Sequence, residues 1–363
     1  MCGIVGAINN KPVTDVLLEG LERLSYRGYD SAGVAVAMFD SIKRRRAKGK
    51  VDVLRSALER RPLEGHIGIA HTRWATHGQP NRRNAHPHMT DDVAVVHNGI
   101  IENYAALRQE LEIAGHKFAS DTDSEVIPRL ITQYLGEGCD PMSAMRETMS
   151  RLQGSYAIAA VFRECDCLFA ARQGSPLVIG IGEDGHFVAS DANAIGNRVK
   201  QIIHLENADL AKLTKDDVVI FDSKGMQVQR LIDDQVFDVQ SSGKNGYRHY
   251  MLKEIHEQPE VLARTSAQYL DDEGQLVASA GLDELATMDR LNIVACGTSC
   301  YAGMIGKYWI ESLVKKPVTV EVASEFRYRD VPLSARDASL FISQSGETAD
   351  TLAAMEYAGS QGQ

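Results

Sequence analysis

The residue best suited to chemistry is the second one in the chain. Cys2 directly follows Met1 and precedes a short apolar run, residues 3–6, that is typical of a strand. A small residue at position 2 normally allows removal of the initiator methionine, which would leave a thiol and a free α-amine on Cys2. Because the α-amine has a pKa of ~7.7–8.0 and a thiol ~8.5, the amine could take the thiol proton. We predict a catalytic nucleophile at Cys2; the alternative is a small residue that begins a buried strand.

A second group of candidates follows a strand predicted at residues 67–70. Arg73 could bind a carboxylate through two parallel N–H bonds, and Trp74 could form a wall of the same pocket. Asp123 lies at the start of a helix predicted over residues 125–135, where residues 122–125 match a capping box. Arg73 and Asp123 together could hold the two charged ends of a free α-amino acid.

A third candidate, the run His97-Asn98-Gly99, follows a strand predicted at residues 93–96. An Asn-Gly pair often forms the turn of a β-hairpin. Here, however, residues 100–103 lead into a helix rather than a return strand. We therefore predict an oxyanion hole, in which the Asn98 side-chain amide and the Gly99 backbone N–H face a developing negative charge.

Taken in order, residues 2–6, 71–78, 97–99 and 122–125 resemble the motifs of class II glutamine amidotransferases, over about residues 2–230. The resemblance implies an α+β, N-terminal-nucleophile αββα sandwich that releases ammonia from glutamine, with Cys2 as nucleophile and its own amine as base. It also implies glutamine binding by Arg73, Thr76, His77, Gly99 and Asp123.

The second half carries two hydroxyl-rich loops between a strand and a helix. Residues 296–299 follow a strand predicted at 291–295, and residues 343–348 follow one predicted at 339–342. Such loops bind phosphate at helix N-termini and at the carboxyl ends of parallel strands, although each could be only a helix cap. They resemble the sugar isomerase (SIS) domain. This resemblance implies sugar-phosphate binding by Thr298, Ser299, Ser343, Gln344, Ser345 and Thr348.

As a whole, the chain resembles the N-terminal part of the amidotransferases that transfer ammonia from glutamine to fructose 6-phosphate. The resemblance implies an aminotransferase of hexosamine biosynthesis with glutaminase activity, a homodimer at full length. Since this family has two isomerase subdomains, we expect the chain to stop inside the first and to retain only the glutaminase half. One alternative is another acceptor, such as phosphoribosyl pyrophosphate. The other is a sugar-phosphate-binding fragment that is not coupled to the glutaminase.

Two domains must position these residues. We predict an amidotransferase domain over residues 2–232, a linker over 233–252, and an incomplete α/β doubly wound parallel-sheet domain over 253–363, in which strands and helices alternate. Residues 180–185 fit the pattern GxGxxG, but they lie between two short strands and open no helix. We therefore interpret them as a hairpin turn.

Composition excludes several classes of protein. The 363 residues carry a net charge of −10, which argues against nucleic acid as a partner, and no apolar stretch approaches the ~20 residues of a membrane span. The six cysteines show no zinc-ribbon spacing, and His86 and His88 have no further ligands at suitable spacing. We expect a reduced, cytoplasmic protein without structural disulfides, metal or cofactor.

Overall fold

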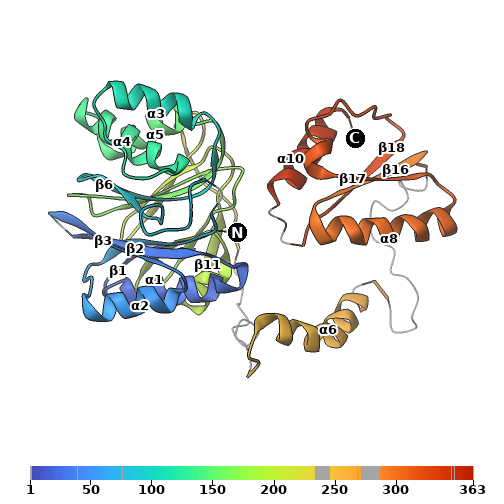
Figure 1. The fold of residues 1–363 in the computed structure, drawn as a ribbon, viewed down its shortest axis with the longest axis horizontal. Coiled ribbons are helices and arrows are strands. Elements are labelled where there is room, and N and C mark those ends of the chain that lie inside the picture. The colour runs from blue at the N-terminus through green and yellow to red at the C-terminus, as the bar shows by residue number, and fades with distance from the viewer. Residues whose placement is uncertain are drawn as a thin grey trace. The chain divides into compact units, whose positions relative to one another are not determined.

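The computed structural model describes residues 2–38, 40–75, 77–233, 246–267, 269–270, 287–344, 346 and 348–362. The chain forms two compact units, residues 1–245 and residues 246–363 (Figure 1). Most of the predicted linker, residues 234–245, lies outside the described residues. Among the described helices, none is long and apolar enough to cross a membrane.

Two antiparallel sheets form the centre of the first unit. The first sheet contains, in spatial order, β15 (Ile232–Asp233), β11 (Gln201–His204), β9 (Val178–Ile181), β10 (Gly185–Ala189), β1 (Gly3–Asn9), β4 (Ile67–Arg73), β2 (Ser31–Met38) and β3 (Ser41–Lys48). The second contains β14 (Gln227–Val228), β13 (Val218–Phe221), β12 (Leu210–Leu213), β8 (Leu168–Gln173), β7 (Gly154–Phe162), β6 (Val93–Ile101) and β5 (His88–Met89). The pairing of β9 with β10 confirms the hairpin predicted for the GxGxxG run.

Helices cover the outer face of each sheet. The first sheet packs against α1 (Thr14–Arg23) and α2 (Val51–Arg60), whereas the second packs against α3 (Tyr104–Ile113), α4 (Val126–Gly136) and α5 (Pro141–Arg151) (Figure 1). Short 3₁₀ turns lie at Leu24–Arg27, Asp123–Glu125, Ala192–Ala194 and Gly196–Arg198. The four layers confirm the predicted αββα sandwich.

Strand periodicity explains why the layers hold together. Successive side chains of a strand point to opposite faces of its sheet. In β1, Ile4 and Ile8 enter the core between the two sheets, whereas Val5 and Ala7 enter the core beneath α1 and α2. The side chains of β6 point alternately into the central core and into the core beneath α3–α5. Both sheets are therefore buried on both faces, and their central strands are fixed in place.

The second unit contains a parallel sheet. Its elements are α6 (Tyr250–Ser266), β16 (Arg290–Ala295), α8 (Gly297–Val314), β17 (Val318–Val322), α9 (Ala323–Phe326), β18 (Asp337–Ile342) and α10 (Ala349–Ser360). The strand order is β17-β16-β18, and β16 pairs in parallel with both neighbours. This arrangement confirms the parallel sheet that the alternation of strands and helices predicted.

Two strands extend further than the sequence indicated. The apolar run of β6 ends at Val96, but pairing with β7 continues to Ile101 opposite Gly154. Likewise β4 continues through Arg73, which pairs with Ser31 of β2. The predicted strand ends at residues 70 and 96 were wrong, because cross-strand pairing carries the polar residues Arg73 and Asn98 into the strands.

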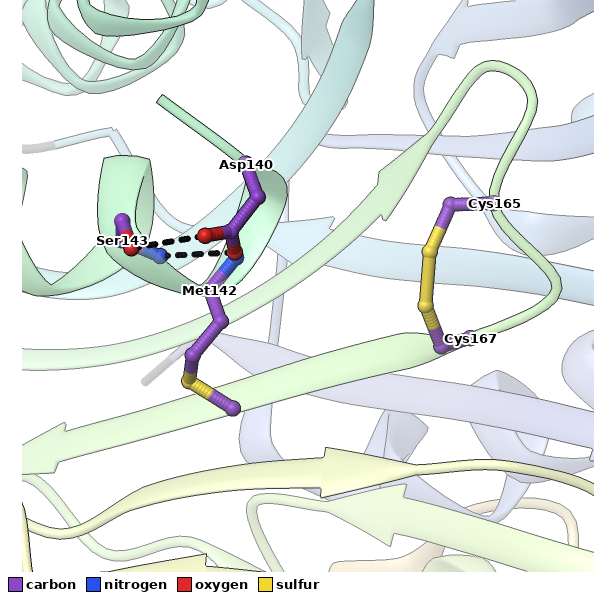
Figure 2. Close-up of a disulfide and its surroundings, with 5 residues drawn as sticks. All are labelled: Asp140, Met142, Ser143, Cys165 and Cys167. Atoms are coloured by element: carbon purple, nitrogen blue, oxygen red, sulfur yellow. Dashed lines mark hydrogen bonds between the residues drawn. A yellow bond between two sulfur atoms is a disulfide. The ribbon is translucent and has the colours of Figure 1, made fainter. Parts of the chain in front are cut away.

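The expectation of no disulfide was also wrong. Cys165 and Cys167 form a disulfide in the turn between β7 and β8, where their Cα atoms lie 5.4 Å apart (Figure 2). The tight turn brings together two thiols that are only two residues apart. Nearby, the Asp140 side chain caps α5 by accepting hydrogen bonds from the backbone N–H groups of Met142 and Ser143.

Candidate functional site

Cys2 lies immediately before β1, where that strand meets the carboxyl end of β4. Gly3 pairs with Thr72, so the chain that follows β4 runs past the thiol. The backbone N–H of Trp74 donates a hydrogen bond to Cys2 Sγ at 3.2 Å. Burial raises the pKa of the Cys2 thiol, while the hydrogen bond from Trp74 and the charge of Arg73 act in the opposite direction. Burial prevails, so this thiol needs a base to become a nucleophile.

Asn98 reaches the same residue from the other sheet. Its side-chain Nδ2 donates to the carbonyl oxygen of Cys2 at 3.3 Å, and its Oδ1 lies 2.9 Å from Nε2 of the buried His71. Gly99, next along β6, is exposed and has φ of +123°. A side chain there would overlap the carbonyl oxygen of Ser155 on β7, so the position requires glycine.

Arg73 is a buried cation with a free donor. Its side chain is 3% exposed, and Nη2 donates to the carbonyl oxygens of His77 and Gly78, the latter at 3.1 Å. Its Nη1 has no hydrogen-bond partner in the described part of the chain. A buried guanidinium N–H without an acceptor is costly, and a carboxylate is the group that satisfies it best.

Asp123 is hydrogen-bonded to β6 and does not cap a helix. It is buried, lies in the 3₁₀ turn before α4, and accepts a hydrogen bond from the backbone N–H of Ile101 at 2.9 Å. The predicted capping box does not form. The Thr122 hydroxyl lies 2.9 Å from Nε2 of His88, and the Glu125 carboxylate instead accepts the N–H of Ser120 at 2.6 Å. Tertiary partners therefore outcompete the local cap.

The remaining residues predicted for this site are less enclosed. The Trp74 side chain is 54% exposed and lies over Gly28, where an added Cβ would come within 2.9 Å of the indole ring. His77 is half-buried, with its ring edge-on to Tyr104 at a centroid distance of 5.5 Å. Thr76 lies outside the described residues.

The structure also adds two residues that sequence reasoning did not assign. Asp30 fixes the chain after β4, because its Oδ2 accepts the backbone N–H of Ala75 at 2.6 Å and its own N–H donates to the carbonyl of Arg73 at 2.8 Å. His71 contacts Asn98, as described above. The partners of Asp30 in the chain after β4 are backbone groups, so no residue pattern could have revealed this role. His71 is two residues before Arg73 in sequence, but its contact with Asn98 depends on the packing of one sheet on the other.

In the second unit, the two hydroxyl-rich loops leave one edge of the sheet side by side. Ala295 at the end of β16 pairs with Ile342 at the end of β18. Thr298 and Ser299 lie in the first turn of α8, and Thr348 is the N-cap residue of α10. The hydroxyls of Ser343 and Thr348 are 3.2 Å apart. Gln344 is exposed, and Ser345 lies outside the described residues.

Fold and sequence comparisons define the class of each unit. Residues 71–197 match the family model of the glutamine amidotransferase domain, and residues 284–363 match that of the SIS domain. Among solved structures, the glutamine phosphoribosylpyrophosphate amidotransferase from B. subtilis, complexed with ADP and GMP, aligns with a TM-score of 0.55. That alignment covers 88% of this chain and 65% of the other at 20% identity, so it shows a shared fold alone. The chain thus contains a region that matches the glutamine amidotransferase domain, followed by a region that matches the SIS domain.

Particular relatives match over the whole chain. It is 50% identical over 363 residues to the glutamine–fructose-6-phosphate aminotransferase [isomerizing] of Caulobacter vibrioides, covering 100% of this chain and 60% of that protein. It is 48% identical over 359 residues to the enzyme of the same name from Mesorhizobium japonicum, covering 98% of this chain and 59% of that one. The chain therefore spans about 60% of the length of the curated relatives that it matches.

Proposed function

We propose that this protein hydrolyses glutamine at Cys2 and supplies the ammonia to fructose 6-phosphate, which becomes glucosamine 6-phosphate. The observation that carries the glutaminase half is the buried Arg73, whose Nη1 has no partner among the described residues. Its charge acts on the Cys2 thiol, and the Asn98 side-chain NH₂ donates to the backbone carbonyl oxygen of Cys2. Identity near 50% along the chain to enzymes named for glutamine and fructose 6-phosphate supports both substrates.

The proposed chemistry begins with the free amine of Cys2 after removal of Met1. This amine takes the thiol proton, and the thiolate attacks the side-chain amide carbon of glutamine. Asn98 Nδ2 and the Gly99 N–H stabilise the oxyanion of the tetrahedral intermediate. The amine then protonates the leaving nitrogen, ammonia departs, and a thioester remains. Water adds to the thioester by the same route, releasing glutamate and restoring the thiol.

Two charged side chains would bind the charged groups at the α-carbon of glutamine. Arg73 would bind the α-carboxylate through its free Nη1 and could do so bidentately. Asp123 would bind the α-ammonium. One of its oxygens accepts the backbone N–H of Ile101, but an ionised carboxylate has further acceptor sites, and these would receive the N–H groups of the ammonium. Trp74, Thr76 and His77 would enclose the rest of the glutamine.

The second unit would bind the phosphate of the sugar. The hydroxyls of Thr298, Ser299, Ser343, Ser345 and Thr348, with the Gln344 amide, would surround it at the starts of α8 and α10. We further propose the domain boundaries 2–232 and 253–363 with a linker between them. For the full-length enzyme we propose a cytoplasmic homodimer.

Glutamate release tests this function directly. Purified protein is incubated with glutamine, and glutamate is assayed in Cys2→Ala and in Cys139→Ala, a matched control because Cys139 is half-buried on the far side of the second sheet. We expect release by wild type and Cys139→Ala and none by Cys2→Ala. Equal release by both variants would refute the assignment of Cys2.

Binding measurements distinguish between the two candidate ammonia acceptors. Calorimetric titration of the same protein with fructose 6-phosphate and with phosphoribosyl pyrophosphate should give heat only with the first. The heat of fructose 6-phosphate binding should be smaller in Thr348→Val than in wild type. Preference for phosphoribosyl pyrophosphate would contradict the proposed acceptor without affecting the glutaminase assignment.

A further inference from the structure

His71 is buried at the centre of the first unit, on β4, with no exposed surface. Its Nε2 lies 3.1 Å from the backbone carbonyl oxygen of His97 and 2.9 Å from Oδ1 of Asn98. A carbonyl oxygen can only accept a hydrogen bond. Nε2 must therefore carry the proton, and this contact selects one tautomer of the imidazole.

The tautomer in turn fixes the orientation of the Asn98 amide. The two ends of an asparagine amide are alike in shape, so the hydrogen-bond partners decide which end is which. Because His71 Nε2 is a donor, the atom that faces it must be the amide oxygen. The NH₂ group is then directed toward Cys2, whose carbonyl oxygen it contacts at 3.3 Å.

The opposite orientation of Asn98 is unfavourable at both ends. A rotated amide would set its NH₂ against the N–H of His71 and its oxygen against the Cys2 carbonyl, giving two repulsive contacts. We propose that His71 is a positioning residue, which holds the Asn98 NH₂ toward Cys2 and the oxygen of the reacting amide. This inference rests on the proposed glutaminase function and adds to it a residue that does not touch the substrate.

The surroundings of His71 keep its ring neutral. Burial, together with the neighbouring His97 and Arg73, lowers the pKa of His71 to about 3, against a hydrogen bond to Asn98 that acts in the opposite direction. Its ring also packs on His86 at a centroid distance of 4.2 Å. Its Nδ1 has no partner in the described part of the chain, so only Nε2 has a bonding role.

Kinetics of four variants test the proposal. His71→Phe keeps the ring but removes the donor, so we expect kcat for glutamate release to fall about 10- to 100-fold with KM nearly unchanged. His71→Gln places an N–H close to the position of Nε2 and should recover most of the activity, whereas His71→Asn, whose N–H lies near the position of Nδ1, should not. His186→Phe, a buried histidine of β10 in the same sheet, is the control and should retain full activity.

A double-mutant cycle separates positioning from general destabilisation. In an Asn98→Ala background His71→Phe should have no further effect on kcat, because there is no amide left to orient. An equal loss of kcat in both backgrounds, or no rescue by His71→Gln, would overturn the proposal.

A second readout does not depend on catalysis. The side-chain ¹⁵N–¹H resonances of Asn98, assigned by their loss in Asn98→Ala, should shift in His71→Phe and stay in place in His186→Phe. If wild type releases no glutamate, the proposed function fails and these resonances still decide the role of His71. Unchanged resonances in His71→Phe would refute it.

Discussion

Lowering the pH from 7.5 to 5 should destabilise the first unit through its buried histidines. His71, His86 and His88 are at most 4% exposed, and their rings contact one another in a row, with centroid distances of 4.2 Å for the tilted pair His71–His86 and 4.5 Å for the edge-on pair His86–His88. Burial lowers the pKa of all three, with Arg73 adding to the effect for each and Arg44 and Arg46 for His88. The folded unit therefore keeps them neutral.

The sign and size of this change in the free energy of unfolding follow from proton linkage. The pKa of His71 is about 3 in the folded protein and ~6.5 in an unfolded chain. Below pH 6.5 the unfolded state binds more protons, so the free energy of unfolding falls as the pH falls toward 3. Between pH 7.5 and 5 this amounts to about 2 kcal/mol for His71. His86 and His88 contribute in the same direction.

Denaturation by urea at the two pH values, followed by circular dichroism, measures the effect. His86→Phe isolates one member of the row, because neither ring nitrogen of His86 has a partner among the described residues and phenylalanine keeps the ring packing. This variant should lose at most about 2 kcal/mol of the pH dependence. His66→Phe, at an exposed position, should lose none. An identical pH dependence in wild type and His86→Phe would refute the reasoning.

Three further predictions concern the two sites. Arg73→Met should raise the KM for glutamine about 100-fold, since it removes a charge-assisted contact, while Arg60→Met at the end of α2 should not change it; equal KM values in both would contradict the carboxylate assignment. Gly99→Ala should lower the free energy of unfolding by about 3 kcal/mol and reduce glutaminase kcat. Gly115→Ala, which also has a positive φ but no atom within 4 Å of the added Cβ, should cost only about 1 kcal/mol; a similar loss in thermal melts of both would argue against crowding at Gly99. Thr348→Val should weaken fructose 6-phosphate binding about tenfold by calorimetry without changing glutamate release, and an unchanged affinity would remove Thr348 from the phosphate site.

The sequence determined the fold class and the types of residue available for chemistry. Apolar runs predicted the strands β1, β4 and β6, and the resemblance carried by the ordered motifs around Cys2, Arg73 and Asp123 implied the αββα sandwich. The alternation of strands and helices after residue 290 was enough to predict a parallel sheet. Such signals are local, because side-chain periodicity and helix spacing are read within a few residues of the chain.

Only the tertiary structure decided how the site residues face one another. Pairing with β7 carries β6 past its apolar run to Ile101, so Asn98 and Gly99 lie within the strand rather than after it. Asp123 bonds to that strand instead of capping a helix, and His71 selects the orientation of Asn98 from the opposite sheet. Each of these contacts joins residues at least 20 positions apart or depends on cross-strand register. Register and the packing of one sheet on another are set by the whole fold, since a shift of one residue would turn every side chain of a strand to the other face.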